Sequence, residues 1–442
     1  MSGFPRDTQG WAGHPPGLST LFFTEMWERF SYYGMRALLI LYMTAPLAAG
    51  GLAFDTPHAA SIYGWYTFGV YAASIPGGWV ADRLLGQYRS VLVGGIVIAL
   101  GHFSLAFEPL PFFFTGLFLI VMGTGLLKPN ISTMVGSLYE AGDARRDAGF
   151  SIFYMGINLG ATVAPLVVGT LGQRINWHAG FAAAGVGMTL GLVQYVLGKK
   201  RLRPALDRLQ PAARHPGAGI AAGAPPPLTA DEWKRIGAIA VFFVFSVLFW
   251  GAYEQAGSSL NLFADRYTRL SAFGLKVESS WFQSLPAVFV ILLAPVFAWL
   301  WVRLGPREPS SPAKFAVGLL FVSLSFLLLV PAAALAQGQS VKVSPAWLFG
   351  VYLLQVTGEL CLSPVGLSVV TKLAPPRIVG SMMGVWFLSL AFGNKLGGWV
   401  AGFFTAVPLP QLFGVVCAAT GAAALLLALL VKPVRRMMRG VH

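Results

Sequence analysis

Charged residues are scarce in this sequence. Only 11% of its 442 residues are Asp, Glu, Lys or Arg, whereas 56% are hydrophobic and the mean hydropathy is +0.66. A soluble domain carries about 25% charged residues. The composition therefore excludes an ordinary soluble globular protein and indicates a chain that crosses a membrane several times.

Cysteine and histidine are scarce as well. The two cysteines, Cys361 and Cys417, fall in separate apolar segments, which argues against a disulfide framework. The six histidines include no HExxH pattern, and the cysteines lack metal-ligand spacing. We therefore expect no metal, no cofactor and no enzymatic activity.

Apolar runs of about 20 residues, the length that crosses a bilayer, recur twelve times. They lie near 18–49, 57–83, 90–107, 111–136, 149–172, 177–198, 235–263, 279–303, 312–334, 345–371, 376–403 and 410–432. We predict an all-α membrane protein with two six-helix bundles. Its parts are a tail (1–17), the first bundle (18–198), a linker (199–231), the second bundle (232–432) and a tail (433–442). The linker contains Pro225, Pro226 and Pro227, so we expect it to be mostly irregular, with room for a short surface helix.

Acidic residues number 17 against 31 Lys and Arg, which gives a net charge of +14. Such a charge would suit nucleic acid, but the basic residues gather in alternate loops, so we expect no nucleic-acid partner. One side of the predicted topology holds 22 of the 31 basic residues, the other holds five, and four lie within the runs. Positive loops stay in the cytoplasm, so we predict that both termini and the linker are cytoplasmic.

The first run contains four ionisable side chains, Glu25, Glu28, Arg29 and Arg36. Each costs roughly 2.5–3.5 kcal/mol at the bilayer centre, so such a cluster indicates paired groups facing a wet cavity. On a helix, Glu25, Arg29 and Arg36 fall on one face, together with Tyr32. The pattern indicates an ion or proton pathway.

Four further charges lie deep within apolar runs. Lys128 needs an anionic partner, for which Glu25 or Glu28 is the candidate, unless it reaches the cytoplasmic surface. Glu254 should lie at the depth of Arg36, and a pair between them would form a proton-dependent outer gate, unless Glu254 is a surface residue at a helix end.

The third of these charges is Glu359, which lies mid-span and invites a cationic substrate group, although a structural carboxylate bonded to nearby Ser or Thr is the alternative. Lys395 is a fourth intramembrane charge that the pattern does not place. Positive residues in the first half and carboxylates in the second suit a zwitterionic ligand. Aromatic residues that could line its cavity, or simply pack, are Tyr32, Tyr33, Tyr71, Tyr154, Trp250 and Trp386.

The loop between the second and third runs carries a motif. The segment 78–89 reads Gly-Trp-Val-Ala-Asp-Arg-Leu-Leu-Gly-Gln-Tyr-Arg, and it resembles the loop motif of the major facilitator superfamily. Asp82 and Arg83 are therefore gate candidates, with a generic charged turn as the alternative. Two six-helix halves with a site near the midplane agree with this resemblance.

Several segments together resemble the proton-dependent oligopeptide transporter (POT) family. They are Glu25-x-x-Glu28-Arg29 with Phe-Ser-Tyr32-Tyr33-Gly, Phe153-Tyr154-Met-Gly156-Ile-Asn158, Lys128-Pro129-Asn130, Glu254-Gln255, Gly358-Glu359-Leu-x-Leu-Ser363-Pro364 and Gly384-Val-Trp386-Phe. The resemblance runs from about 20 to 400.

The resemblance implies proton-coupled import of di- and tripeptides by alternating access. Glu25, Glu28 and Arg29 would couple protons, with Lys128 as their partner and Glu254 at the gate. The implied substrate residues are Arg36 and Lys128 for the peptide carboxylate, Glu359 for its amino terminus, Asn158 for its backbone, and Tyr32, Tyr33, Tyr71, Trp250, Trp386, Glu254 and Ser363 around it. The partners expected are peptides, protons and the lipid bilayer, for a monomer in the bacterial inner membrane.

Two departures from the family pattern stand out. The segment 199–231 is too short and too Pro-rich for the two extra helices that many bacterial relatives carry, and Pro286 replaces the asparagine that the family often has after Gln283-Ser284-Leu285. The second departure leaves peptide preference open. Alternatives are a relative that carries nitrate or another small metabolite, and a peptide-sensing transceptor.

Overall fold

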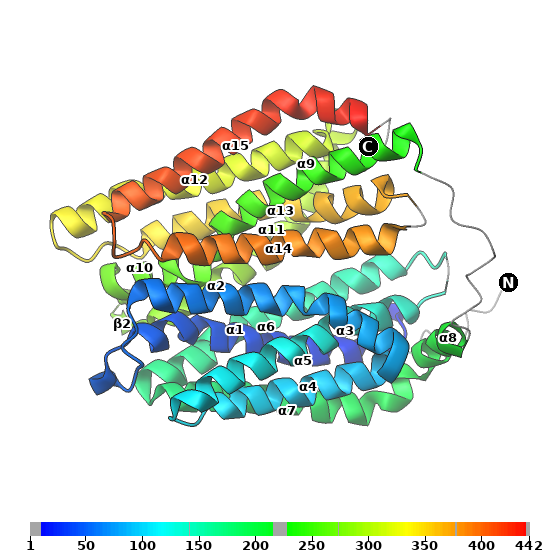
Figure 1. Ribbon diagram of the computed structural model, residues 1–442, viewed down its shortest axis with the longest axis horizontal. Helices are drawn as coiled ribbons and strands as arrows, with labels where there is room; N and C mark the ends of the chain where they lie inside the picture. Colours follow the sequence, from blue (N-terminus) through cyan, green and yellow to red (C-terminus); the bar gives the residue numbers. More distant parts are fainter. Residues whose placement is uncertain (1–9, 141, 215–227, 273, 376–377, 439–442) are drawn as a thin grey trace. The chain divides into compact units, whose positions relative to one another are not determined.

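The structure is a computed structural model that describes residues 10–140, 142–214, 228–272, 274–375 and 378–438 (Figure 1). It divides into two compact units, which are Met1–Leu38 with Ala72–Pro225, and Leu39–Tyr71 with Pro226–His442. The predicted halves follow the chain order, whereas this division assigns 39–71 to the unit that holds the second half. The predicted part boundaries stay a prediction.

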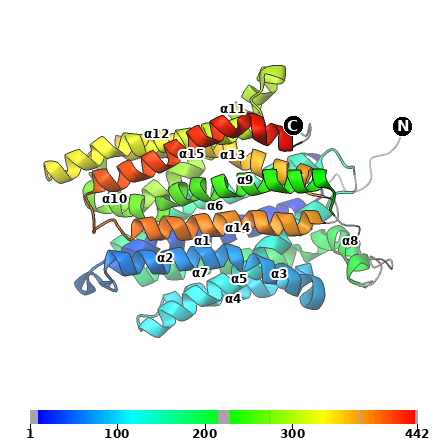
Figure 2. The same ribbon diagram turned by 45° about the horizontal axis from the view of Figure 1, so that its top comes forward.

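The first unit is a helical bundle. Its elements are η2 (Trp11–Gly13), most of α1 (Gly17–Thr44), α3 (Ser74–Val80), the π-helical turn η4 (Ala81–Leu85), α4 (Gln87–Leu105), α5 (Leu110–Ser137), α6 (Arg146–Arg174), α7 (Trp177–Leu197), η5 (Gly198–Leu202) and α8 (Arg203–Arg214). The helices α4 and α5 lie side by side (Figures 1 and 2). Their close approach requires glycine, because a Cβ on Gly94 would lie 2.6 Å from the Gly123 carbonyl oxygen.

The second unit is also helical. It holds the end of α1, η3 (Leu47–Ala49), α2 (Thr56–Ala72), α9 (Ala230–Tyr253), η6 (Glu254–Gly257), α10 (Ser259–Tyr267), β1 (Ser271–Ala272), β2 (Leu275–Lys276), η7 (Ser279–Ser284), α11 (Leu285–Leu304), η8 (Gly305–Arg307), α12 (Ser311–Gly338), α13 (Ala346–Leu373), α14 (Val379–Ala401) and α15 (Leu409–Met437). The strands form one antiparallel pair, with Ser271 opposite Lys276. The helices α12 and α15 pack along each other, and Ser323 Oγ donates to the Cys417 carbonyl at 2.8 Å.

Each of the twelve apolar runs contains helix in the structure. Nine helical segments of the described chain are long and apolar enough to cross a membrane. The runs outside this set are those that hold α1, α2 and α14. Of these, α1 carries four charged residues and α2 is only 17 residues long. The all-α membrane class is therefore confirmed, and the count of twelve spans stays a prediction.

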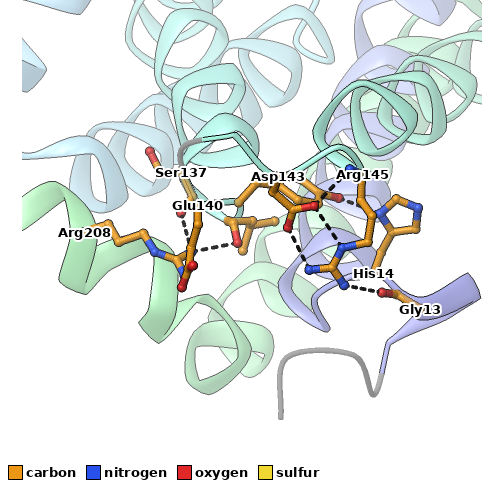
Figure 3. A network of polar contacts seen from close by, with 9 residues as sticks. Gly13, His14, Ser137, Glu140, Asp143, Arg145 and Arg208 are labelled. Atoms are coloured by element: carbon orange, nitrogen blue, oxygen red, sulfur yellow. Dashed lines mark hydrogen bonds and ion pairs between the residues drawn. The ribbon is translucent and has the colours of Figure 1, made fainter. Parts of the chain in front are cut away.

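The start of the linker is helical, and residues 203–214 form the short helix for which the sequence left room. Residues 215–227 lie outside the described part, so the expectation of a mostly irregular linker stays a prediction. Leu202 and Ala205 of η5 and α8 are buried in the core of the first unit. Arg208 donates from Nη1 to the Ser137 and Leu138 carbonyl oxygens, at 3.1 and 2.7 Å. These carbonyls end α5 and need donors, so Arg208 fastens the linker helix to the bundle (Figure 3).

The N-terminal tail is fastened to the same end of the first unit (Figure 3). His14 Nδ1 lies 2.8 Å from the Tyr139 hydroxyl, and Arg145 donates to the Gly13 carbonyl at 2.7 Å. Arg145 also pairs with Asp143 at 2.7 Å, and its hydrogen bonds lower the pKa of that carboxyl to about 2. Burial, together with the charge of Arg145, lowers the pKa of His14, so the neutral imidazole is favoured here.

Candidate functional site

The charged residues of α1 form one buried cluster in the first unit. Arg29 Nε lies 3.1 Å from Glu25 Oε1, and Arg29 also pairs with Glu28. The side chains of Glu25, Glu28 and Arg29 are at most 3% exposed. Glu25 and Arg29 meet because residues four apart share a helix face. The α1 cluster, as we name these three residues, therefore holds two carboxyl groups and one guanidinium away from water.

The surroundings of the α1 cluster are tightly packed. A Cβ on Gly160 of α6 would lie 2.2 Å from the Met26 carbonyl oxygen and 3.1 Å from Arg29 Cβ. Glycine at 160 thus lets α6 press directly against the helix turn that carries the charges. The half-buried Lys128, in the middle of α5, acts electrostatically on Glu25. Its ammonium is the charge that can balance the second carboxylate of the cluster.

The face of α1 continues with aromatic and cationic groups. The guanidinium carbon of Arg29 lies 5.3 Å from the ring centre of Tyr32, and that of Arg36 lies 5.9 Å from the ring centre of Tyr33. These distances are typical of cation–π contacts. Tyr32 is 1% exposed and Arg36 is 6% exposed, so both belong to the interior.

Asn158 lies on α6 of the same unit and is buried. Its side-chain amide donates to the Tyr154 carbonyl one turn earlier, at 3.0 Å. Tyr154 itself is 42% exposed. Asn158 is thus held by its own helix, and its amide oxygen is the group that could meet a ligand.

The second unit holds a separate carboxylate. Tyr253, the last residue of α9, donates its hydroxyl to Glu359 Oε2 of α13 at 2.5 Å. Glu359 is only half-buried, so part of the carboxylate stays accessible. One hydrogen bond leaves most of its acceptor capacity open. The Tyr253–Glu359 pair can therefore orient a carboxylate toward a cation.

Further polar residues, on α13 and η7, lie in the same unit as Glu359, and the sequence pattern did not indicate them. Gln283 donates to the Tyr352 hydroxyl at 3.2 Å and to the Ala256 carbonyl at 2.5 Å. Gln355 is fully buried, and neither polar atom of its amide has a hydrogen-bond partner among the described residues. Tyr352, Gln355 and Glu359 share one face of α13, since they are spaced by three and four residues. That spacing is visible in the sequence and could have indicated this face.

The remaining candidates of the second unit pack to different degrees. Trp250 is 9% exposed and lies 5.3 Å from the Tyr253 ring, which places it beside the Tyr253–Glu359 pair. Trp386 is buried and packs against Gly366, where a Cβ would lie 2.3 Å from its ring; its predicted contact with the substrate stays a prediction. Tyr71 is also buried, whereas Ser363 is partly exposed.

The gate candidates lie at helix ends. Asp82 and Arg83 are exposed in η4, and Asp82 accepts a hydrogen bond from Gln87 in the first turn of α4 at 3.0 Å. That placement agrees with a carboxylate near a helix N-terminus. Glu254 is buried at the start of η6, in the second unit, and Arg36 is buried in the first. Their predicted pairing stays a prediction.

Two residues of uncertain role have a place in the structure. Lys395 Nζ lies 4.0 Å from the ring centre of Trp65, so a cation–π contact with α2 accommodates this intramembrane charge. Pro286 lies in the first turn of α11, where its missing N–H is tolerated.

The described residues contain no group of three or more His, Cys, Asp or Glu that could hold a metal ion. What they contain is a buried acid–base cluster in one unit and an accessible, oriented carboxylate in the other. The first can exchange protons, and the second can bind an ammonium group.

Comparison with known proteins agrees with these features. A model of the POT family matches residues 88–206 and 228–416. The chain is 39% identical to a peptide transporter of Yersinia enterocolitica and 36% identical to a di-/tripeptide transporter of Lactococcus lactis subsp. cremoris. Each match covers 97% of this chain, and covers 96% and 98% of the relative respectively.

A solved structure is similar over the same extent. The crystal structure of a peptide transporter in complex with sulfate has a TM-score of 0.90 and 42% identity, and the match covers 98% of both chains.

Proposed function

The chain belongs to the POT family and is a multi-pass membrane transporter of peptides; we propose that it couples the import of di- and tripeptides to protons at the α1 cluster. Relatives of this chain are peptide transporters, and one solved POT family transporter is in complex with 5-aminolevulinic acid. Such ligands carry an amino group and a carboxyl group, as a peptide does.

The observation that carries the proposal is the charge balance of the α1 cluster. Two carboxyl groups and one guanidinium are buried together, so one more positive charge is needed for neutrality. Either the Lys128 ammonium or a bound proton can supply that charge. When the carboxylate of a peptide draws Lys128 away, the cluster must take up a proton. This exchange would couple movement of the peptide to movement of the proton.

The peptide itself needs charged partners at both ends. Arg36 and Lys128 carry positive charge for the peptide carboxylate, and the accessible Glu359 carboxylate, oriented by Tyr253, carries negative charge for the amino terminus. Asn158 and the aromatic residues Tyr32, Tyr33, Tyr71 and Trp250 would contact the remainder of the peptide.

The proposal also covers the orientation of the transporter in the membrane, its oligomeric state and its gates. The excess of basic residues in alternate loops supports cytoplasmic termini. We propose a monomer in the bacterial inner membrane that alternates between an outward and an inward state, with Arg36 and Glu254 at the outer gate and Asp82 and Arg83 at the cytoplasmic end.

Uptake into proteoliposomes tests this function. Labelled dialanine should accumulate faster when the exterior is acidic, and a protonophore should abolish accumulation while exchange of peptide persists. Protein-free liposomes provide the control. Uptake that is indifferent to both the pH gradient and the protonophore would show that protons do not drive transport.

A further inference from the structure

A cavity of about 660 Å³ lies at one end of the second unit; Glu359 is not among the residues that line it, and the mechanism above does not use it. It is lined by residues from the end of α11 with η8, the start of α12, the C-terminal half of α13 and the end of α15. At this side of the unit, α11 finishes and α12 begins. The distribution of basic residues among the loops predicts that this side is cytoplasmic.

The charges of this end pocket are mostly positive. Three cationic side chains, Lys314, Lys372 and Arg435, line it against one carboxylate, that of Glu308. Lys314 is only 8% exposed, pairs with Glu308, and places its ammonium 4.2 Å from the ring centre of Trp301. Glu308 is the one acidic residue among the described residues of the lining, and it pairs with Lys314, so this lining carries a net positive charge.

The start of α12 adds to this charge. Ser310 and Ser311, at the N-terminus of this 28-residue helix, also line the end pocket. Ser310 makes no side-chain cap to the helix. The partial positive charge of a helix N-terminus favours an anion, in particular a phosphate group.

The other wall of the end pocket is apolar. Leu360 and Val369 of α13 line it and are almost fully buried, and Trp301 of α11 contributes its ring. A free inorganic anion makes no use of such a wall. A ligand that carries a phosphate on an apolar body satisfies both parts of the lining.

We propose that the end pocket binds the phosphate of an anionic phospholipid, whose glycerol and first acyl segment lie against the apolar wall. Lys372 and Arg435, both exposed at the rim, attract the headgroup from the bilayer surface, and Lys314 stands deeper beside Trp301. Basic pockets between membrane helices on the cytoplasmic side are suited to such headgroups. The inference requires a membrane-spanning chain and does not depend on which solute is transported.

Fluorescence quenching by brominated lipid tests the site. The full chain is reconstituted into phosphatidylcholine bilayers with increasing amounts of brominated phosphatidylglycerol, and separately with brominated phosphatidylcholine. The difference in quenching between the natural chain and Trp301→Phe reports on Trp301 alone. We expect half-quenching at a severalfold lower content of the anionic lipid than of the zwitterionic lipid.

Charge variants make the test specific. Lys372→Gln and Arg435→Gln should each raise the anionic lipid content needed for half-quenching by about fivefold, since one cationic residue near the surface contributes about that factor. Arg436→Gln is the matched control, because Arg436 is exposed next to Arg435 but does not line the end pocket. Glu308→Gln should act in the opposite direction and lower that content.

Further outcomes decide between sources of phosphate. Equal quenching by both lipids, or equal effects of Arg435→Gln and Arg436→Gln, would overturn the site. If inorganic phosphate stabilises the protein in pure phosphatidylcholine at low concentration, and Arg435→Gln abolishes this effect while lipid preference is absent, the ligand is free phosphate and the lipid assignment is wrong. Should Trp301→Phe fail to fold, native mass spectrometry of lipid retained by the charge variants gives the same comparison.

Discussion

Replacing Glu359 by Gln should remove the preference for a free amino terminus on the peptide. The structure leaves this carboxylate partly accessible, and among the described residues one donor, the Tyr253 hydroxyl, binds it. Glutamine keeps the size and removes the charge. The variant therefore isolates the attraction between the carboxylate and an ammonium group.

The size of the effect follows from the type of bond. A hydrogen bond to a charged partner contributes roughly 1.5–3 kcal/mol, which corresponds to about 10- to 150-fold in affinity. An N-acetylated dipeptide has lost its ammonium. In the natural protein it should compete about 10- to 150-fold less well than the free dipeptide, and in Glu359→Gln the two should compete about equally.

The assay is competition against labelled dialanine in counterflow, which does not depend on the proton gradient. Tyr253→Phe is the matched control, because it removes the donor and keeps the carboxylate; this variant should still discriminate against the acetylated dipeptide. The reasoning fails if acetylation lowers competition by the same factor in the natural protein and in Glu359→Gln.

Three further predictions extend the test to other parts of the chain. Glu28→Gln removes a buried carboxyl group from the α1 cluster, so proton-driven uptake of dialanine should be lost while counterflow remains; full driven accumulation would exclude Glu28 from coupling. Gly160→Ala places a Cβ 2.2 Å from a backbone oxygen and should destabilise the protein by about 1–3 kcal/mol, seen as a lower thermal midpoint in detergent, whereas Gly414→Ala meets no atom within 4 Å and should leave the midpoint unchanged or raise it. Arg36→Ala and Glu254→Gln should each increase labelling of a cysteine introduced into the outer cavity, and the double variant should equal the singles; additive effects would show that the two residues act separately.

The sequence was sufficient to predict contacts between residues of the same helix. Glu25 and Arg29 are four residues apart, so their ion pair follows from helical geometry alone. Hydropathy likewise predicted twelve apolar runs, and each of them contains helix in the structure. Both signals are local, and neither needs the packing of one helix against another.

Partners on different helices could not be predicted in this way. The donor to Glu359 is Tyr253, 106 residues away, and Lys395 lies over Trp65, a residue of α2. Such contacts depend on rotation of each helix about its axis, which hydropathy leaves undetermined. The burial of the helix at 203–214 was not predictable for another reason, because its short apolar face is buried only through contacts with other helices of the first unit.

The fastening of the N-terminal tail has a consequence for the order in which the chain folds during synthesis. His14 meets Tyr139, 125 residues later, and the α5 carbonyls meet Arg208, 70 or 71 residues later still. The ribosome synthesises these partners in order. The tail therefore has its hydrogen-bond partners only after Tyr139 and Arg145 have been made, and the end of α5 has the Arg208 donor only after α7 has been made. A nascent chain arrested before Tyr139 should present an accessible tail to protease, and one arrested after α8 should protect it.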